Sequence, residues 1–568
     1  MYITSVPNRK SPPAILLRES YRDNGKVKSR TLANLSKLPA ESIEVLRRSL
    51  QGEQLVCASD AFEAIASSHH GHVQAVLHAM RRLGFAELIA ARTSTQRNLV
   101  LAMVVARILE PDSKLATTRW WHITTLPSLL GVNDADEDDL YQALDWLLKR
   151  QERIEGKLAA RHLEEDALAL YDLSSSYFEG VTCPLAAFGH NRDGKKGKLQ
   201  VNYGLLTNSR GIPVAVSVFK GNTGDPTTLL PQLSKVRDQF GLERFVLVGD
   251  RGMITQKQVD VLRDIDGVEW IAALRPEAIN KLLDSGALQM DLFDQRNLFE
   301  LIHPDFPGER LVACRNPELA KRRTEKRKSL LEATANELHK IRRMVDRGRL
   351  KGQDAIGVRI GKVVNKYKVA KHFTLDIQDH RFDFTIDDNK VAAEAAMDGL
   401  YVVRTSLNAQ RMNADDAVRS YKQLSQVERA FRSLKTIDIN VRPIRHHREP
   451  RVRAHIFLCM LAYYVQWHML EAWRPLLFCD EDQQGKASRD PVAPAKRSAS
   501  ALQKVHARTL DDGTEVHSFR TLLKHLSAIV RNVCRLPDSG PDAPTFDVMT
   551  TPNAKQQRAY DLLENIRL

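Results

Sequence analysis

The sequence predicts a multidomain α/β (α+β) protein built around a mixed β-sheet with flanking helices. One observation is length, because 568 residues correspond to about three or four domains. The other is a series that begins near residue 167, in which segments follow one another as strand, hairpin, helix, strand, helix, strand. Such an order is typical of a sheet on which helices pack.

Residues 1–50 are predicted to form an N-terminal β unit. The segments Ile15–Tyr21 and Val27–Leu32 flank Asn24-Gly25, a pair that favours a type I′ hairpin turn. The arginines and lysines of this unit suit contact with a phosphate backbone. On charge grounds alone, a merely solvated hairpin explains them about equally well.

Residues 51–165 are predicted to form a helical domain for DNA binding or dimerisation. Apolar residues recur at helical spacing over His72–Leu83, Gln96–Leu109 and Leu140–Leu163. Arg119–Trp121 could contact DNA, although paired tryptophans in a helical region more often belong to a core.

Residues 166–275 are predicted to be the first part of the central sheet domain. Two apolar runs in it, Ala167–Asp172 and Arg244–Asp250, each end in an aspartate. An aspartate at such a point often caps a turn or a helix, but its carboxylate can also bind a metal ion. The other predicted elements are strands over 199–205, 212–218 and 268–274 and helices over 226–240 and 255–265.

Residues 276–397 interrupt the series and are predicted to form an α/β insertion. Its main feature is a long helix around Leu319–Val345, and the strand-like segments Lys371–Ile377 and Arg381–Ile386 follow. The segment Lys321–Lys328 at the start of the helix is rich in cations. Such a run is usually a solvated helix face.

The second part of the sheet domain, residues 398–470, contains a predicted helix over Ala414–Lys435. At about 100° per residue, Tyr421, Glu428 and Lys435 share one face of this helix, beside an apolar stripe. A glutamate and a lysine seven residues apart are common on solvated helices. The same arrangement also suits a metal ion held next to a phosphate.

The remaining elements complete the predicted architecture. Leu400–Thr405 is expected to be a strand that returns to the sheet, and His455–Leu470 an apolar helix that covers it. Residues 471–568 are expected to be a linker and a C-terminal helical tail with one clear helix, Phe519–Val530.

The charge balance favours a polyanionic partner. The chain has 84 Lys and Arg against 70 Asp and Glu, which gives a formal net charge of +14. A basic excess on this scale points to nucleic acid, although charge alone reports only non-specific attraction.

Cysteine usage and apolar runs argue against other classes of protein. No two cysteines form a CxxC pair, so neither a zinc knuckle nor a disulfide framework is suggested. The longest apolar run, Ile456–Trp467, is too short to span a bilayer, and no signal-peptide core is present. We therefore expect a cytoplasmic protein without a membrane partner. The six cysteines are Cys57, Cys183, Cys314, Cys459, Cys479 and Cys534.

Three acidic residues fall into one pattern: Asp172 and Asp250 end strand-like runs, and Glu428 lies on a helix beyond the insertion. On these residues the chain resembles the DDE-type insertion-sequence transposases, which have a ribonuclease H-like catalytic core of the retroviral integrase superfamily. The resemblance covers about residues 165–470. Further matching segments are Tyr171-Asp172 with Ser174–Ser176, Gly221–Asp225 and Gly249–Gly252.

The helix resembles more narrowly the group with a Tyr-x2-Arg-x3-Glu-x6-Lys signature. Tyr421, Glu428 and Lys435 match this spacing, and Leu424 stands where the signature has arginine. Arg429 or Arg432 could supply the missing cation.

The resemblance implies a metal-dependent site. Asp172, Asp250 and Glu428 would be the catalytic residues and the ligands of two Mg²⁺ ions, for which Mn²⁺ can substitute. Two ions can activate the attacking oxygen and stabilise the leaving one in phosphodiester transfer. The residues expected to contact DNA phosphates are Tyr421, Lys435, Arg429, Arg432 and Arg251.

The function implied is that of a bacterial DNA transposase. Such an enzyme binds the terminal inverted repeats of its element, cleaves the ends and joins the 3′ ends to target DNA. The expected partner is double-stranded DNA, bound by a homodimer on paired ends in the cytoplasm, in association with the nucleoid. Two alternatives remain: a non-cleaving DNA-binding protein of transposase descent, and a hydrolytic nuclease on the same fold.

Overall fold

The chain divides into two units, which are described one at a time. The computed structural model describes residues 1–9, 11–53, 61–289, 293, 297–537 and 539–568. The first unit comprises Met1–Ser68 and Val530–Thr550, and the second comprises His69–Ile529 and Thr551–Leu568. Of the cysteines, Cys57 lies outside the described residues.

The first unit begins with an antiparallel sheet of three strands, β1 (Tyr2–Val6), β2 (Ala14–Asp23) and β3 (Lys26–Asn34). Asn24 and Gly25 join β2 to β3 and have φ angles of 50° and 74°, as a type I′ turn requires. The predicted hairpin is therefore confirmed. The helix α1 (Ala40–Leu50) follows the sheet.

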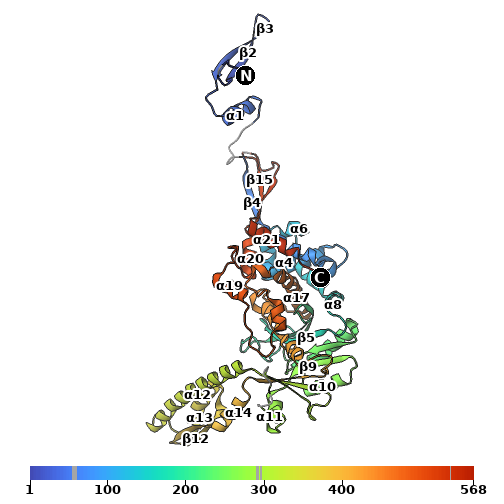
Figure 1. Ribbon diagram of the computed structural model, residues 1–568, viewed down its shortest axis with the longest axis vertical. Helices are drawn as coiled ribbons and strands as arrows, with labels where there is room; N and C mark the ends of the chain where they lie inside the picture. Colours follow the sequence, from blue (N-terminus) through green and yellow to red (C-terminus); the bar gives the residue numbers. More distant parts are fainter. Residues whose placement is uncertain (10, 54–60, 290–292, 294–296, 538) are drawn as a thin grey trace. The chain divides into compact units, whose positions relative to one another are not determined.

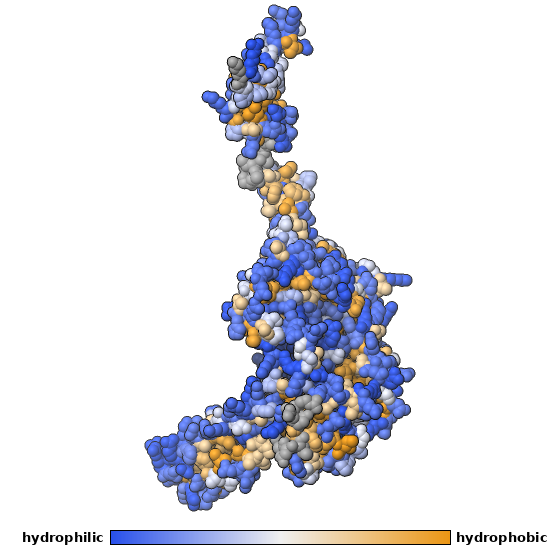
Figure 2. All heavy atoms as spheres, viewed as in Figure 1, coloured by the Kyte–Doolittle hydropathy of each residue, from blue (hydrophilic) through white to orange (hydrophobic). Residues whose placement is uncertain are grey.

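The same unit contains a second sheet, made from distant parts of the sequence, in which β15 and β16 pair antiparallel. Its strand order is β16 (Phe546–Met549), β15 (Val530–Arg535) and β4 (Glu63–His69). Exposed apolar side chains gather on it, and they form the orange area of Figure 2 at the position of β15 and β4 in Figure 1. The members of this patch are Phe62, Ile65, Phe546 and Met549.

The centre of the second unit is a mixed sheet of eight strands in the order β10-β11-β14-β9-β8-β5-β6-β7. The strands β5, β8 and β9 run parallel, and β6, β7, β14, β11 and β10 pair antiparallel with their neighbours. This sheet confirms the predicted fold class. The strands are β5 (Leu168–Tyr177), β6 (Gln200–Thr207), β7 (Pro213–Lys220), β8 (Phe245–Val248), β9 (Val268–Ala273), β10 (Leu298–Leu301), β11 (Arg310–Arg315) and β14 (Leu400–Thr405).

The first strand of the sheet is longer than the sequence predicts. Asp172 was expected to end a strand, but β5 continues through Leu173 and the serines as far as Tyr177. The serines have little strand propensity of their own, and the antiparallel partner β6 supplies the pairing that keeps them extended, for example Ser175 with Asn202. Asp172 therefore lies within a strand.

Helices cover the sheet and form the region that precedes it. The apolar helix α17 (Glu449–Ala472) packs on β7 and on helices α4 and α7, which agrees with its predicted covering role. The helix predicted over Leu140–Leu163 is in fact two helices, because the backbone turns at Lys149-Arg150. The helices before the sheet are α2 (Gly71–Arg82), α3 (Phe85–Ile89), α4 (Thr95–Leu109), α5 (Lys114–Trp121), α6 (Leu126–Leu130), α7 (Glu137–Leu148) and α8 (Gln151–His162).

Shorter helical segments connect the strands of the sheet. A 3₁₀ turn (Asp225–Thr228), α9 (Leu229–Ser234) and a π-helical turn (Lys235–Gln239) follow β7. The helix α10 (Gln256–Arg263) lies between β8 and β9, and α11 (Pro276–Asp284) follows β9.

The segment between β11 and β14 has a hydrophobic core of its own. That core is built from the long helix α12 (Pro317–Asp346), α13 (Gln353–Tyr367) and the hairpin of β12 (Phe373–Ile377) and β13 (Phe382–Ile386), and α14 (Asp388–Ala396) follows. One cation of the basic run is not solvated as expected. Arg327 is buried and pairs with Asp398 at 2.6 Å, because tertiary packing brings a buried acid to it.

The predicted helix over Ala414–Lys435 is three helical pieces that follow one another. They are α15 (Ala414–Lys422), α16 (Leu424–Arg432) and a π-helical turn over Ser433–Ile437. Tyr421, Glu428 and Lys435 therefore belong to different pieces.

The C-terminal part is helical except for the strands that join the first unit. Its helices are α18 (Gln483–Ser488), α19 (Ala499–Ala507), α20 (Phe519–Leu526) and α21 (Ala554–Leu563). The helix predicted over Phe519–Val530 ends earlier because Val530 begins β15. Within the described part of the chain, no helix is long and apolar enough to cross a membrane.

Candidate active site

The register of two parallel strands brings Asp172 and Asp250 to the same level of the sheet. Leu170 of β5 is paired with Val248 of β8, and each aspartate follows two residues later. The paired residues Leu170 and Val248 are 78 positions apart in the sequence, and so are Asp172 and Asp250. The two strands are neighbours in the sheet, so Asp172, within β5, lies level with Asp250, just beyond the end of β8.

The helix that carries Glu428 lies over the face of the sheet to which Asp172 belongs. Successive side chains of a strand alternate between faces, so Asp172 and Ser174 share one. Ser174 is paired across the sheet with Tyr203, whose ring contacts that of Phe431 on α16 at 5.8 Å between centroids. The helix α16 also packs directly on β5.

The three carboxylates influence one another electrostatically. Burial, then the charge of Asp250, and to a smaller extent that of Glu428, raise the pKa of Asp172 to about 7. The Leu173 N–H, which donates to Asp172 at 2.8 Å, and the Arg192 guanidinium oppose this rise. A cation bound between the carboxylates would offset the same repulsion.

Asp250 also has a structural role. Its Oδ1 accepts hydrogen bonds from the N–H groups of Gly252 and Met253, both at 2.9 Å. This is the turn-capping arrangement expected for an aspartate after a strand. The other oxygen, Oδ2, makes no hydrogen bond to any residue that the structure describes, so capping leaves it available to a ligand.

The donor set suits a hard divalent cation, because Mg²⁺ prefers carboxylate oxygens and usually keeps water and substrate phosphate in its shell. As placed, however, no three His, Cys, Asp or Glu side chains among the described residues lie close enough together to hold a metal ion. Glu428 is exposed at the surface of α16, and Asp172 is half-buried.

Tyr421 and Arg251 lie close to the carboxylates. Burial, followed by the charge of Asp250, raises the pKa of Tyr421 to about 12, and Glu428 and Asp172 contribute to the rise. Arg251, which is exposed, opposes it. The phenol therefore keeps its proton at neutral pH and can donate a hydrogen bond.

Lys435 lies in a different environment from the other residues of the signature. It is buried, and its Nζ lies 3.0 Å from Oδ1 of Asp193, whose side chain is 2% exposed. Arg442 forms an ion pair with the same oxygen, and the N–H of Tyr177 donates to the other at 2.9 Å. The charge of Lys435 is thus compensated within the protein.

Arg429 and Arg432 are both exposed on α16. The charge of Arg429 acts on Tyr463 of α17 and on Cys479 beyond it. Neither arginine forms a recorded ion pair in the described part of the chain.

Two residues near the site were not identified from the sequence. Arg192 forms a bidentate ion pair with Asp225 through Nη2, at 2.5 and 2.6 Å, and lowers the pKa of Asp172. Its neighbour Asp193 binds Lys435. The charged cluster of the loop 190–198 was a possible signal, but nothing local indicates which acid or base each residue meets.

Two family models match the chain. The model described as the transposase DDE domain matches residues 180–465, just over half of the chain. The chain belongs to the DDE transposases. The model described as the N-terminal domain of the IS1634 family transposase matches residues 2–62.

The DDE match includes Asp250 and Glu428 and begins after Asp172. No curated protein matches the chain. Among solved structures, the chain is similar to a cryo-EM structure of the piggyBac transposase synaptic complex with hairpin DNA. The identity is 10%, the match covers 82% of this chain and 84% of that chain, and the TM-score is 0.32.

Membership of the family identifies the activity. The protein is a DNA transposase of an insertion sequence, and DDE transposases are metal-dependent enzymes that cleave and join DNA. Its partner is therefore DNA, and the enzymes of this family use divalent metal ions.

Proposed function

We propose that Asp172, Asp250 and Glu428 are the catalytic carboxylates of this transposase, and that together they hold two Mg²⁺ ions, for which Mn²⁺ can substitute. When bound, the ions would polarise the scissile phosphodiester and lower the pKa of the attacking hydroxyl. The observation that carries this proposal is the strand register, which brings Asp172 level with Asp250 under the helix of Glu428.

The chain's own residues would do the rest of the work. The Tyr421 hydroxyl keeps its proton and can donate a hydrogen bond to a backbone phosphate beside the carboxylates. Arg251 is exposed at the same place and supplies a cation. Arg429 and Arg432 would contact phosphates farther along the DNA.

Lys435 is also assigned to phosphate binding, which requires that its ammonium group leaves Asp193. Its Nζ is shared with Asp193, so a DNA phosphate has to compete with that carboxylate. Arg442 pairs with the same oxygen and can keep Asp193 neutralised if Lys435 turns to DNA.

The substrate we propose is the pair of terminal inverted repeats of the element, together with target DNA. The protein would act as a homodimer on paired ends, in the bacterial cytoplasm at the nucleoid. The exposed cations of the β2–β3 hairpin and the net charge of +14 favour binding to a phosphate backbone.

We propose that the chain is organised in six segments. Residues 1–50 form a β unit, 51–165 a helical domain for DNA binding or dimerisation, and 166–275 the first part of the core. Residues 276–397 form the insertion, 398–470 the second part of the core, and 471–568 the linker and C-terminal tail.

The test is a joining assay with a labelled element end, a supercoiled plasmid and purified protein. We expect Mg²⁺-dependent transfer of the labelled 3′ end into the plasmid, and loss of both cleavage and transfer for Asp250→Asn. Cleavage without transfer would indicate a hydrolytic nuclease. Binding without cleavage under all metal conditions would indicate a protein that no longer acts as an enzyme.

A further inference from the structure

A second charged region lies away from the carboxylates, in a pocket of about 330 Å³. Its walls come from α4, the start of α5, α7, the segment 440–446 and α17. This volume is at the lower end of the range typical of ligand pockets, which begins at about 300 Å³. The basic residues that line it are Arg107, Lys114, Arg442, Arg445, His446 and His455.

Two of these cations are buried without an acidic partner. Lys114 is 3% exposed, and within the described chain its ammonium group has no recorded hydrogen bond or ion pair. Arg107 is 6% exposed, and the hydrogen bond recorded for its guanidinium goes to the carbonyl oxygen of Asp112 at 2.9 Å. Buried charges in proteins are normally paired, because desolvation of an unpaired ion is costly.

The other charges of the lining do not neutralise this pair. Asp112 is exposed, and its carboxylate accepts the N–H of Ser113 at 2.6 Å. Arg442 is paired with Asp193, and Arg445 lies 3.1 Å from Glu179. The interior of the pocket therefore has an excess of positive charge.

The two histidines of the pocket add hydrogen-bonding groups without adding charge. Burial, and then the nearby Lys114 and Arg107, lower the pKa of His446 to about 3, and the pKa of His455 lies well below its ordinary value. Nε2 of His455 is 3.1 Å from the carbonyl oxygen of Val441, so the neutral ring donates there, and Nδ1, which is buried without a partner among the described residues, is left as an acceptor. An acceptor nitrogen does not bind an anion, so the pocket's donors to an anion are its ammonium and guanidinium groups.

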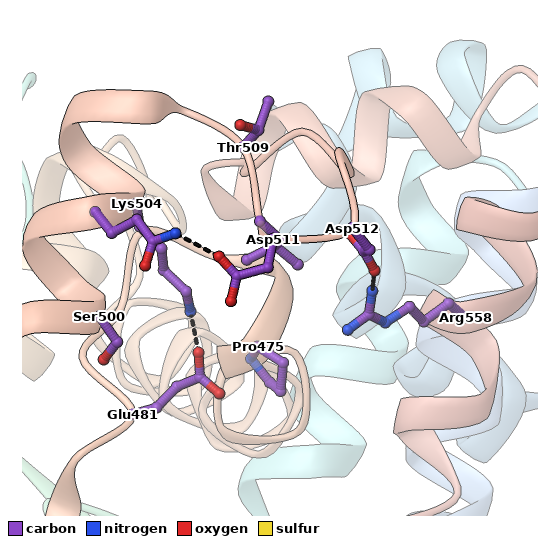
Figure 3. A pocket seen from close by; sticks show the side chains of 10 residues that line it. Pro475, Glu481, Ser500, Lys504, Thr509, Asp511, Asp512 and Arg558 are labelled. Carbon is purple, nitrogen blue, oxygen red and sulfur yellow. Dashed lines mark hydrogen bonds and ion pairs between the residues drawn. The ribbon is translucent and has the colours of Figure 1, made fainter.

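A second pocket, formed by residues between Pro475 and Arg558, contains a buried lysine that is paired with an acid (Figure 3). Lys504 is also 3% exposed, but its Nζ lies 2.5 Å from Oε1 of Glu481. In the same pocket Arg558 lies 2.6 Å from Asp512. Each cation has its acid, so this pocket offers no uncompensated cation to a ligand, and Lys504 is a matched control for Lys114.

We propose that the pocket of Arg107 and Lys114 binds a phosphate group of the DNA on which this transposase acts. A phosphate is the anion that a DNA-binding protein meets most often, and its oxygens can accept from an ammonium and a guanidinium together. Burial and Arg107 lower the pKa of Lys114 to about 7, and a bound anion would restore its charge. The proposal rests on DNA binding and not on the assignment of the carboxylates.

The test compares wild type, Lys114→Met and Lys504→Met, all full length, on a duplex from the element end in EDTA, where cleavage cannot contribute. We expect Lys114→Met to lower the affinity about tenfold and the salt slope by about one unit, while Lys504→Met matches wild type. Arg445 lines the same pocket and is exposed, and Arg445→Gln should also bind the duplex more weakly than wild type.

A set of duplexes with one neutral methylphosphonate each then locates the contact. Wild type should lose affinity at one particular linkage, and Lys114→Met should be indifferent to that linkage. Equal affinities, slopes and linkage profiles for all variants would refute the proposal. The proposal would also be overturned if inorganic phosphate raised the Tm of wild type but not of Lys114→Met, while Lys114→Met bound DNA as wild type does. The pocket would then bind free phosphate and not a phosphate of DNA. If wild type showed the expected DNA-binding results but no Mg²⁺-dependent cleavage, the assignment of the catalytic carboxylates would be wrong and the phosphate pocket would stand.

Discussion

Two regions of the second unit have charges of opposite sign that the protein leaves uncompensated. Asp172, Asp250 and Glu428 form no recorded ion pair among the described residues, and the pKa of Asp172 is raised by burial and then by the charges of the other two. In the pocket, Arg107 and Lys114 are buried without an acid. Elsewhere in the unit, buried ions such as Arg327, Lys504 and Asp193 are paired.

The difference indicates which charges serve the fold and which serve a ligand. A paired buried ion can be explained by packing, whereas an unpaired one lowers stability and is retained where binding needs it. Asp193 connects the two regions, because it pairs with Lys435 of the signature and with Arg442 of the pocket wall.

The largest effect is expected at the carboxylates. Glu428→Gln should lower Mg²⁺-dependent cleavage by at least about 10³-fold, since loss of a metal ligand removes several kcal/mol of transition-state stabilisation. DNA affinity should stay equal or rise slightly, because one acid–phosphate repulsion is removed. Single-turnover cleavage and gel-shift titration on the same fragment measure both, and Glu318→Gln, an exposed acid on α12, is the control. Full cleavage by Glu428→Gln would remove this residue from the site.

The next effect concerns stability and has opposite signs in the two pockets. At pH 7, Lys114→Met should raise the free energy of unfolding by about 1–4 kcal/mol, because it removes a buried unpaired charge. Lys504→Met should lower it by a similar amount, because it leaves Glu481 without its partner. Chemical denaturation measures both. If the two variants changed the free energy of unfolding in the same direction, Lys114 and Lys504 would not differ in whether the protein compensates their charge.

The gain from Lys114→Met should depend on pH in a defined window. The folded pKa is about 7 and the ordinary value is 10.5, so between these values the unfolded chain binds the proton that the folded chain has lost. Wild-type stability therefore rises with pH through this window. The difference from Lys114→Met should be full at and below pH 7 and shrink towards pH 10.5. A gain that stays constant over this range would contradict the depressed pKa.

A smaller effect is expected at the acid between the two regions. Lys435→Met should cost roughly 1–3 kcal/mol of stability, because Arg442 still neutralises Asp193. Asp193→Asn should cost more, since the buried Lys435 and the partly buried Arg442 then lose their acid at once. Thermal unfolding of the two variants side by side tests this order, and the reverse order would mean that Lys435 is not held by Asp193 in solution.

The smallest effect is expected for an exposed charge. Arg432→Gln should change the free energy of unfolding by no more than about 0.5 kcal/mol, as is usual for surface positions. If Arg432 contacts a phosphate, the salt slope of DNA binding should fall by about one unit. A stability loss above 1 kcal/mol would show that this exposed arginine is structural.

The sequence alone was sufficient for those features that depend on local chemistry. Asn24-Gly25 predicted its turn because few residues adopt positive φ at two successive positions. The apolar runs predicted most strands of the sheet, and the long apolar helix was expected to cover it. The spacing of Asp172, Asp250 and Glu428 was sufficient to suggest the family that the comparison then established.

The tertiary structure decided which charges meet. Strand β5 extends past Asp172 only because β6 pairs with its serines, a contact between residues 25 to 29 positions apart in the sequence. Helical periodicity put Lys435 on the face of Glu428, but it could not show that Asp193, 242 residues earlier, neutralises that lysine. The uncompensated pair Arg107 and Lys114 was equally hidden, since a missing partner becomes visible only when every neighbouring element is in place. Local sequence determines which conformations a segment prefers, whereas the compensation of a buried charge depends on distances that only the packed fold sets.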